Sequence, residues 1–214
     1  MADAPAALTR RALVAALPWL MAARPALGAE AKVVTMLGDS ITAGLGLPAA
    51  QALPAQLHLA LERLGVANVV RGAGVSGDTA ADGAARVDFS VQPDTSVVVV
   101  ALGGNDLLQG IDPRVMRANL DRIVSRLTQR HMAVILAGLQ APPEIGRGYA
   151  RDFNAVFASV ARAHHVALYP DLLAGVARDP KLKQSDGLHP NAQGVRRIAA
   201  GLAPVVARAL AQRR

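Results

Sequence analysis

Short apolar runs alternate with amphipathic stretches along most of this chain. Five runs are too short for helices and rich in Val, Ile, Leu and Ala, so they predict buried β-strands at residues 32–37, 68–70, 97–102, 133–137 and 166–169. The run at 97–102 is apolar on both faces, which is typical of a central strand in a parallel sheet covered by helices on each side.

Between these runs, apolar residues recur at helical spacing. The pattern predicts helices over about 53–64, after Asp112, and around 153–160. Asp112-Pro113 is a typical helix start, because Asp is a common N-cap and Pro fits the first helical position. A last helix is expected from about Asn191 to the C-terminus, with a bend at Pro204. The alternation predicts one α/β domain with a parallel sheet of about five strands.

The first thirty residues have the pattern of a signal peptide. Arg10-Arg11 precedes an apolar stretch at 12–23, which is shorter than the roughly 20 residues needed to span a bilayer. Small residues at 26–31 offer a cleavage site. We therefore expect residues 1–30 to be removed, leaving a periplasmic or secreted domain at 31–214 without stable membrane insertion. The paired arginines are compatible with twin-arginine export.

Composition narrows the classes of function. The 214 residues fit one domain of ordinary size. The net charge of +7 suggests nucleic-acid binding, but the arginines are scattered along predicted helices and no basic stripe alternates with aromatics. We therefore expect no nucleic-acid partner. The chain contains no cysteine, which excludes disulfides, thiolate metal sites and cysteine nucleophiles in it.

Polar residues cluster in four segments next to these elements. Gly38-Asp39-Ser40, residues 74–78 and residues 103–106 each follow one of the first three strands, and residues 186–189 precede the last helix. The carboxyl ends of parallel strands meet at one edge of a sheet, where ligands bind. We expect all four segments to converge on that edge.

These segments hold the groups that acyl transfer needs. A serine nucleophile requires a base and donors for the developing oxyanion. Asp186 and His189 are three residues apart, which places both side chains on one side of a turn, so that Asp186 can orient His189 toward Ser40. The backbone N–H of Gly77 and the amide of Asn105 are candidate oxyanion donors.

In their order along the chain, the four segments resemble the four blocks of the SGNH (GDSL) hydrolase superfamily. The resemblance is greatest to its bacterial thioesterase I / protease I / lysophospholipase L1 and arylesterase subgroup. It implies Ser40 as nucleophile, His189 as base, Asp186 as its partner, and an oxyanion hole made by Ser40, Gly77 and Asn105.

The resemblance also implies the rest of the architecture and the substrates. It implies a flavodoxin-like three-layer α/β/α sandwich over residues 31–214 that uses no metal or cofactor. The substrate class it implies is a small-molecule ester, thioester or lysophospholipid. We expect the protein to act as a monomer, with the proline-containing segment 141–149 forming a wall of the substrate cleft.

Several polar residues have simpler interpretations. Ser76 lies in a near match to the Gly-x-Ser-x-Gly elbow, but Asp78 occupies the last position, so we expect an ordinary loop residue. Asp39 and Asp106 are expected to brace their loops by accepting backbone N–H bonds. The histidines outside the proposed triad are expected to have structural roles: His58, His131, His164 and His165. A metal at His164-His165 lacks an evident third ligand.

Two alternatives remain open. A carbohydrate O-deacetylase would use the same four blocks, although the chain's one Trp, two Tyr and three Phe leave few aromatic platforms for sugars. A binding module that kept the fold but lost its chemistry is the other, and the intact Ser40, Asp186 and His189 weigh against it.

Overall fold

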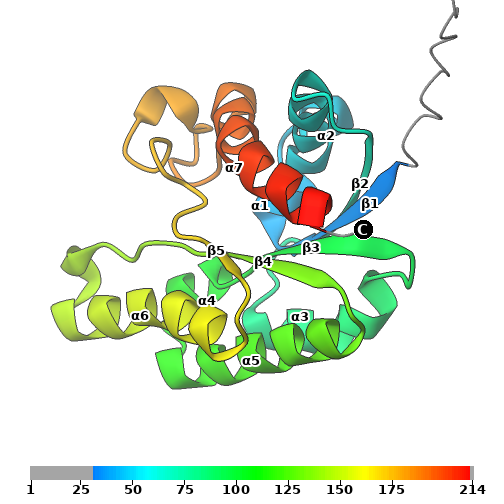
Figure 1. Cartoon of the computed structure of the whole chain (residues 1–214). Coiled ribbons are helices and arrows are strands. Elements are labelled where there is room, and N and C mark those ends of the chain that lie inside the picture. The colour runs from blue at the N-terminus through cyan, green and yellow to red at the C-terminus, as the bar shows by residue number, and fades with distance from the viewer. Residues whose placement is uncertain (1–30, 213–214) are drawn as a thin grey trace, which may run out of the picture.

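The computed structural model of the protein describes residues 31–212 (Figure 1). The predicted signal peptide, residues 1–30, lies outside the described residues. No helix in the described part combines the length and the hydropathy needed to cross a bilayer.

Five parallel strands form one sheet in the order β2-β1-β3-β4-β5. They are β1 (Lys32–Gly38), β2 (Asn68–Gly74), β3 (Thr95–Ala101), β4 (Ala133–Ala137) and β5 (Ala167–Tyr169). The predicted five-stranded parallel sheet is confirmed. The predicted bounds agree within two residues for every strand except β2, which continues to Gly74 instead of ending at Val70.

Strand β2 is longer than its pattern suggests, and glycine is required at the residue where it ends. Among the described strands, β2 pairs with β1 alone, and its second half, Arg71 to Gly74, is neither apolar nor alternating. A Cβ on Gly74 would lie 2.3 Å from the backbone nitrogen of Ala43 and 2.7 Å from the carbonyl oxygen of Asp39. Only glycine therefore lets this strand end lie against the segment that carries Ser40.

The helices cover both faces of the sheet (Figure 1). One layer contains α1 (Ser40–Ala43), α2 (Leu53–Arg63) and α7 (Ala192–Gln212), and the other contains α3 (Ala80–Ser90), α5 (Pro113–Gln129) and α6 (Arg147–Ala163). Shorter elements lie in the connections: α4 (Gly104–Leu108), η1 (Ala49–Gln51), η2 (Pro143–Ile145) and η3 (Pro180–Leu182). The expected three-layer α/β/α sandwich is confirmed.

Most predicted helices form where the pattern places them. Asp112 caps α5 by accepting a hydrogen bond from the backbone N–H of Arg114, and α7 runs through Pro204. Helix α3 was not predicted, because its buried face consists only of Ala80, Gly83 and Val87. The small face is required by the packing: a Cβ on Gly83 would lie 2.2 Å from Leu102.

The core lies against the central strands. Val97 to Val100 of β3 are completely buried, as the run of β-branched residues predicts. Phe153 and Phe157 of α6 are at most 2% exposed and pack edge to face, with ring centroids 5.6 Å apart. This packing gives the carboxyl ends of the strands a rigid base.

Candidate active site

Ser40 begins helix α1, and only Asp39 separates it from Gly38, the last residue of β1. Asp39 is the N-cap of this helix, and its side chain accepts a hydrogen bond of 3.0 Å from the backbone N–H of Ile41. The helix ends after one turn because Gly44 adopts the left-handed conformation, with φ +78°. The short helix holds Ser40, which is 9% exposed, at the carboxyl edge of the sheet.

His189 connects Ser40 to Asp186. Its Nε2 lies 2.9 Å from Ser40 Oγ, and its Nδ1 lies 2.7 Å from Asp186 Oδ2. With the imidazole proton on Nδ1, His189 donates to the carboxylate, and Nε2 is free to accept the serine proton. The structure thus brings together the three residues that the sequence predicted as a triad.

A turn, rather than a helix, gives Asp186 and His189 their common direction. Asp186 Oδ1 accepts hydrogen bonds from the backbone N–H groups of Leu188, at 2.8 Å, and His189, at 3.0 Å. Gly187 adopts φ +70°, a conformation that side-chain-bearing residues rarely adopt. The same carboxylate therefore shapes the turn with one oxygen and contacts the imidazole with the other.

Gln184 ties the histidine segment to the serine segment. Its backbone N–H donates to the carbonyl oxygen of His189 over 2.8 Å. Its side-chain amide donates to the carbonyl oxygens of Leu45, at 2.8 Å, and Pro190, at 3.0 Å. Because Leu45 lies just after α1, this one residue helps to fix the distance between Ser40 and His189.

Hydrogen bonds lower the pKa of Asp186 to about 2. The largest contribution comes from the backbone N–H of Leu188, followed by the His189 side chain and the His189 backbone N–H. The carboxylate is consequently ionised throughout the range in which proteins are usually active, although its side chain is 46% exposed. It can therefore accept the imidazole N–H bond and stabilise a positive imidazolium.

Burial has the opposite effect on Asp39. This residue is 4% exposed, and removal from water raises the pKa of its carboxyl group to about 6. The Ile41 N–H and positive charge on His189 lower that pKa, while the nearby Asp78 raises it.

Asp39 braces the segment before Ser40, and Asp106 does the same for the loop before α3 by accepting the Ala80 N–H at 2.8 Å. Both aspartates therefore make the backbone contacts expected from the sequence.

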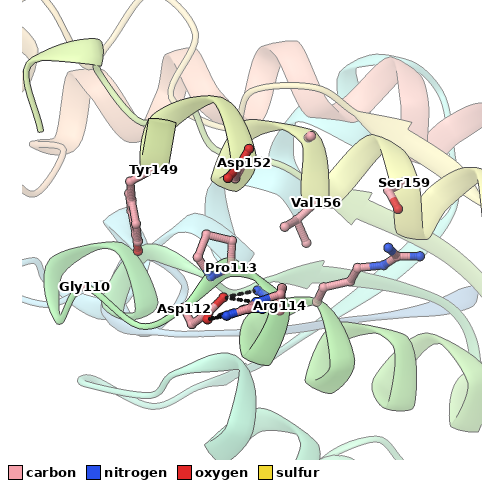
Figure 2. A pocket seen from close by; sticks show the side chains of 10 residues that line it. Gly110, Asp112, Pro113, Arg114, Tyr149, Asp152, Val156 and Ser159 are labelled. Carbon is pink, nitrogen blue, oxygen red and sulfur yellow. Dashed lines mark hydrogen bonds and ion pairs between the residues drawn. The ribbon is translucent and has the colours of Figure 1, made fainter. Parts of the chain in front are cut away.

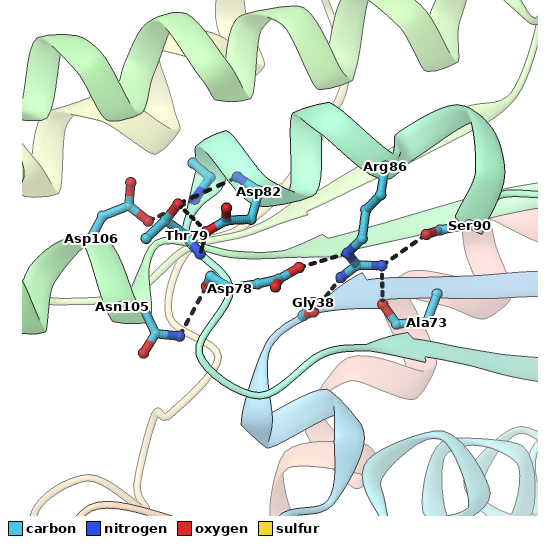
Figure 3. A network of polar contacts seen from close by, with 10 residues as sticks. Gly38, Ala73, Asp78, Thr79, Asp82, Arg86, Ser90, Asn105 and Asp106 are labelled. Carbon is cyan, nitrogen blue, oxygen red and sulfur yellow. Dashed lines mark hydrogen bonds and ion pairs between the residues drawn. The ribbon is translucent and has the colours of Figure 1, made fainter.

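The predicted oxyanion donors, Gly77 and Asn105, lie in the two segments beside Ser40. Gly77 is exposed and adopts φ +93° in the loop after β2. Asn105 lies in the first turn of α4, where its amide nitrogen donates to the carbonyl oxygen of Asp78 over 2.9 Å (Figure 3). This bond joins the two segments, since Asp78 directly follows Gly77.

Both segments also border the residues around Ser40. The backbone N–H of Val75 donates to the carbonyl oxygen of Gly38 over 3.1 Å. A Cβ on Gly104 would lie 3.0 Å from Asp39 Oδ2, so this part of α4 packs directly on the N-cap. The four segments predicted to converge do so at one edge of the sheet.

Sequence reasoning did not identify Arg86. This residue of α3 places its Nε 2.6 Å from Asp78 Oδ2, in the loop that contains Gly77 (Figure 3). No sequence pattern marks it, because the helix that carries it was itself not recognised.

The remaining histidines of the described region lie in other settings. His58 Nδ1 is 2.9 Å from Asn68 Oδ1, and His164 Nε2 is 2.9 Å from Asp121 Oδ1. His131 and His165 adopt positive φ at turns that follow helices. Across residues 31–212, no group of three or more His, Cys, Asp or Glu side chains is arranged to hold a metal ion.

A hollow of about 650 Å³ lies between the start of α5 and helix α6 (Figure 2). Asp112 on its wall is bound to Arg114, with 2.5 Å between Oδ2 and Nη2. The Tyr149 hydroxyl at its edge donates to the carbonyl oxygen of Ile111 over 2.8 Å. None of the triad residues lines this hollow, so it is separate from the candidate active site.

Comparison with known proteins shows which protein family the chain belongs to. Residues 36–197 match the sequence model of the GDSL-like Lipase/Acylhydrolase family. The chain belongs to this family and is an ester hydrolase with the fold of SGNH hydrolases.

Particular relatives have similar lengths and structures. The chain is 37% identical over 163 residues to "Esterase TesA" of Pseudomonas aeruginosa, covering 76% of this chain and 81% of that protein. It is 33% identical over 164 residues to "Thioesterase 1/protease 1/lysophospholipase L1" of Escherichia coli K12, covering 76% and 77% of the two chains. A crystal structure of TesA superposes with a TM-score of 0.79 at 33% identity, covering 83% of this chain and 99% of the other.

The raised pKa of Asp39 predicts a measurable effect on stability. Folded Asp39 binds its proton more tightly than the unfolded chain does, so the contribution of Asp39 to the free energy of unfolding should fall as pH rises from about 4 to about 6. A shift from 3.8 to about 6 corresponds to about 3 kcal/mol. Asp39→Asn keeps an acceptor for Ile41 but cannot ionise. Part of this difference is already present at pH 4, so urea unfolding should show Asp39→Asn gaining about 2 kcal/mol relative to the parent protein between pH 4 and pH 7.

Titrations of groups that do not interact with Asp39 are common to both proteins and cancel in this comparison. A difference between the two proteins that stayed constant from pH 4 to pH 7 would show that Asp39 titrates normally.

Proposed function

We propose that this protein hydrolyses esters by two-step acyl transfer through Ser40. The observation that carries the proposal is the continuous line of hydrogen bonds from Ser40 Oγ through His189 to Asp186, at 2.9 and 2.7 Å. Ser40 acts as nucleophile, His189 as general base and acid, and Asp186 as the group that orients and stabilises the imidazole.

The geometry supports a defined sequence of proton transfers. Ser40 Oγ attacks the carbonyl carbon while its proton moves to His189 Nε2. The resulting imidazolium is stabilised by ionised Asp186, and it then gives the proton to the leaving alkoxide or thiolate. A water molecule then gives a proton to His189 and attacks the acyl-enzyme. The bond from the acyl carbon to Ser40 Oγ breaks, His189 returns the proton to Oγ, and the carboxylic acid is released.

We assign the oxyanion hole to the Ser40 N–H, the Gly77 N–H and the Asn105 amide. The amide has two N–H donors, and its bond to the Asp78 carbonyl uses one of them. Donors that are held in place before the reaction stabilise the oxyanion without a reorganisation cost. The network that holds Asp78 therefore supports this assignment.

Exposed apolar side chains support an apolar acyl or aryl group in the substrate. Five of them lie in the segments at the carboxyl edge of the sheet and are 46–60% exposed: Leu45, Val75, Leu108, Ile145 and Leu188. Ile145 belongs to the segment expected to form a wall of the cleft. The names of the relatives extend the proposed substrate class to thioesters and lysophospholipids.

The nucleophile is tested by substitution with a matched serine control. Ser40→Ala should lower kcat for a p-nitrophenyl ester on the order of 10⁵- to 10⁶-fold. Asn105→Ala should cost less, roughly 10²- to 10³-fold, because one oxyanion donor is lost while the nucleophile remains. Ser76→Ala changes a serine in a neighbouring loop and should retain the parent rate. A fluorophosphonate probe should label the parent protein on the peptide that contains Ser40.

His189 belongs to the same unit. The double variant of Ser40→Ala and His189→Ala should be little worse than either single variant. Near-normal ester hydrolysis by folded Ser40→Ala would contradict the mechanism.

The five exposed apolar side chains at the carboxyl edge of the sheet predict that the rate of hydrolysis depends on the length of the acyl chain. The ratio kcat/KM for p-nitrophenyl esters should rise from acetate to hexanoate by roughly two- to fourfold per methylene, since each buried methylene contributes up to about 0.8 kcal/mol. Parallel assays on acetylated xylan provide the comparison with sugar esters. Fastest hydrolysis of acetyl groups, on xylan or on the model ester, would instead support a carbohydrate O-deacetylase.

We also propose that the chain is exported and that residues 31–214 form the mature hydrolase domain. The basic residues Arg10-Arg11, the apolar stretch at 12–23 and the small residues at 26–31 support this proposal. Expression of the full chain in a Gram-negative host should yield periplasmic protein whose intact mass lacks about the first thirty residues. Full-length protein confined to the cytoplasm would contradict it. The monomeric state stays a prediction.

A further inference from the structure

The guanidinium of Arg86 donates to four acceptors at once. Its Nε contacts Asp78 Oδ2 at 2.6 Å, and its Nη atoms contact the carbonyl oxygens of Ala73 and Gly38 and the Ser90 hydroxyl, each at 2.9 Å (Figure 3). The side chains of Arg86 and Asp78 are only 19% and 12% exposed. The group is therefore a partly buried clamp rather than a surface ion pair.

Three of these acceptors lie within four residues of a proposed oxyanion donor, in or next to the segments that connect the sheet to Ser40 and Gly77. Gly38 ends β1 and is followed by Asp39 and Ser40. Ala73 is next to the end of β2, and Asp78 directly follows Gly77. One side chain on α3 thus joins the ends of two strands to the loop that follows the second of them.

Asp78 connects Arg86 to the third proposed oxyanion donor, the Asn105 amide. Its carboxylate binds Arg86, while its carbonyl oxygen accepts the hydrogen bond from the Asn105 amide. A shift of Asp78 would therefore change the positions of the Gly77 N–H and the Asn105 amide together.

Packing contributes little to the position of Gly77. A Cβ on this residue would find no atom within 4 Å, and its neighbours Val75 and Ser76 are exposed. The loop is instead held by polar contacts, including the bond from the Val75 N–H to the Gly38 carbonyl oxygen. Because oxyanion stabilisation depends on donor distance, the rigidity supplied by Arg86 has a direct chemical consequence.

We propose that Arg86 is a positioning residue that sets the geometry of the oxyanion hole through Asp78. This inference rests on the proposed function of Ser40, Gly77 and Asn105. Arg86 itself touches no reacting atom, and its effect is transmitted by the backbone on either side of Gly77.

Lysine cannot replace arginine at this position. Arginine offers five N–H donors in a rigid planar fork, which here point to acceptors on two strands, a loop and α3. A lysine ammonium is a single point on a flexible stem and cannot reach all of them with the same geometry. Arg86→Lys keeps the charge next to Asp78, so it removes the clamp without leaving a buried carboxylate alone.

The main test separates kcat from KM. In Arg86→Lys, kcat for a p-nitrophenyl ester should fall roughly 10- to 100-fold, less than the loss of a whole donor. The KM should stay within about twofold, because the exposed apolar side chains other than Val75 lie outside the segments that Arg86 holds. Arg71→Ala breaks a bidentate pair with Asp94, at 2.6 and 2.7 Å, on the exposed surface and should leave both constants within about twofold of the parent.

A double variant tests the route through Asp78. If Arg86 acts by placing Asn105 and Gly77, then Arg86→Lys should cost less in an Asn105→Ala background than in the parent protein. Rescue gives a second readout: millimolar methylguanidinium should restore part of the kcat of Arg86→Ala and none of that of Asn105→Ala. Denaturant unfolding of each variant shows that the folded protein is being assayed.

The outcomes distinguish this inference from the proposed function. A parent protein that neither hydrolyses esters nor labels at Ser40 would overturn the proposed function. An active parent with a folded Arg86→Lys whose kcat is within twofold of it would overturn the role of Arg86. Losses that multiply fully in the double variant would also overturn it, because Arg86 would then act independently of Asn105. If Arg86→Ala does not fold, Arg86→Lys and its double variant decide the question.

Discussion

The contact between Ser40 Oγ and His189 Nε2 is 2.9 Å long and joins residues 149 positions apart in the chain. Its serine end depends on β1, which lies between β2 and β3 in the sheet and ends at the short helix that carries Ser40. Its histidine end depends on a turn shaped by Asp186. Gln184 connects the two ends directly. The 2.9 Å separation of these two groups is thus maintained by hydrogen bonds to the backbone on both sides rather than by the two side chains alone.

Aspartates around this contact show how environment determines chemistry. Asp186 is half exposed and accepts three hydrogen bonds, which lower its pKa to about 2, so that it is suited to orient and stabilise a cation. Asp39 is one residue from Ser40 but buried, and its pKa rises to about 6. Asp78 is bound by Arg86 and serves to hold a loop. Three aspartates in one site therefore have three roles: Asp186 supplies a negative charge, Asp39 caps a helix, and Asp78 holds a loop through its ion pair with Arg86.

Much of the fold could be predicted because its strands are continuous β-branched or aliphatic runs. The run at 97–102 identified the central strand, since a sheet covered on both faces requires apolar residues at every position. The second half of β2 and all of α3 were not predicted. Arg71 to Gly74 lacks alternation because two of these four residues are glycines, which carry no side chain and give no hydrophobic pattern. Helix α3 has Gly83 where Leu102 leaves no room for a side chain, and the small residues Ala80 and Gly83 give a weak helical pattern.

The sequence by itself determined the residue types and order of the site: a serine after the first strand, a glycine loop, an asparagine, and an Asp-x-x-His turn. These are local features, and each lies within a few residues of an element whose period can be recognised. Only the tertiary structure decided that Arg86 lies against Asp78, that Gln184 bridges to Leu45, and that Asp39 and Asp186 have opposite pKa shifts. Those relations depend on burial and on contacts between distant segments, which chain order does not encode in any local pattern.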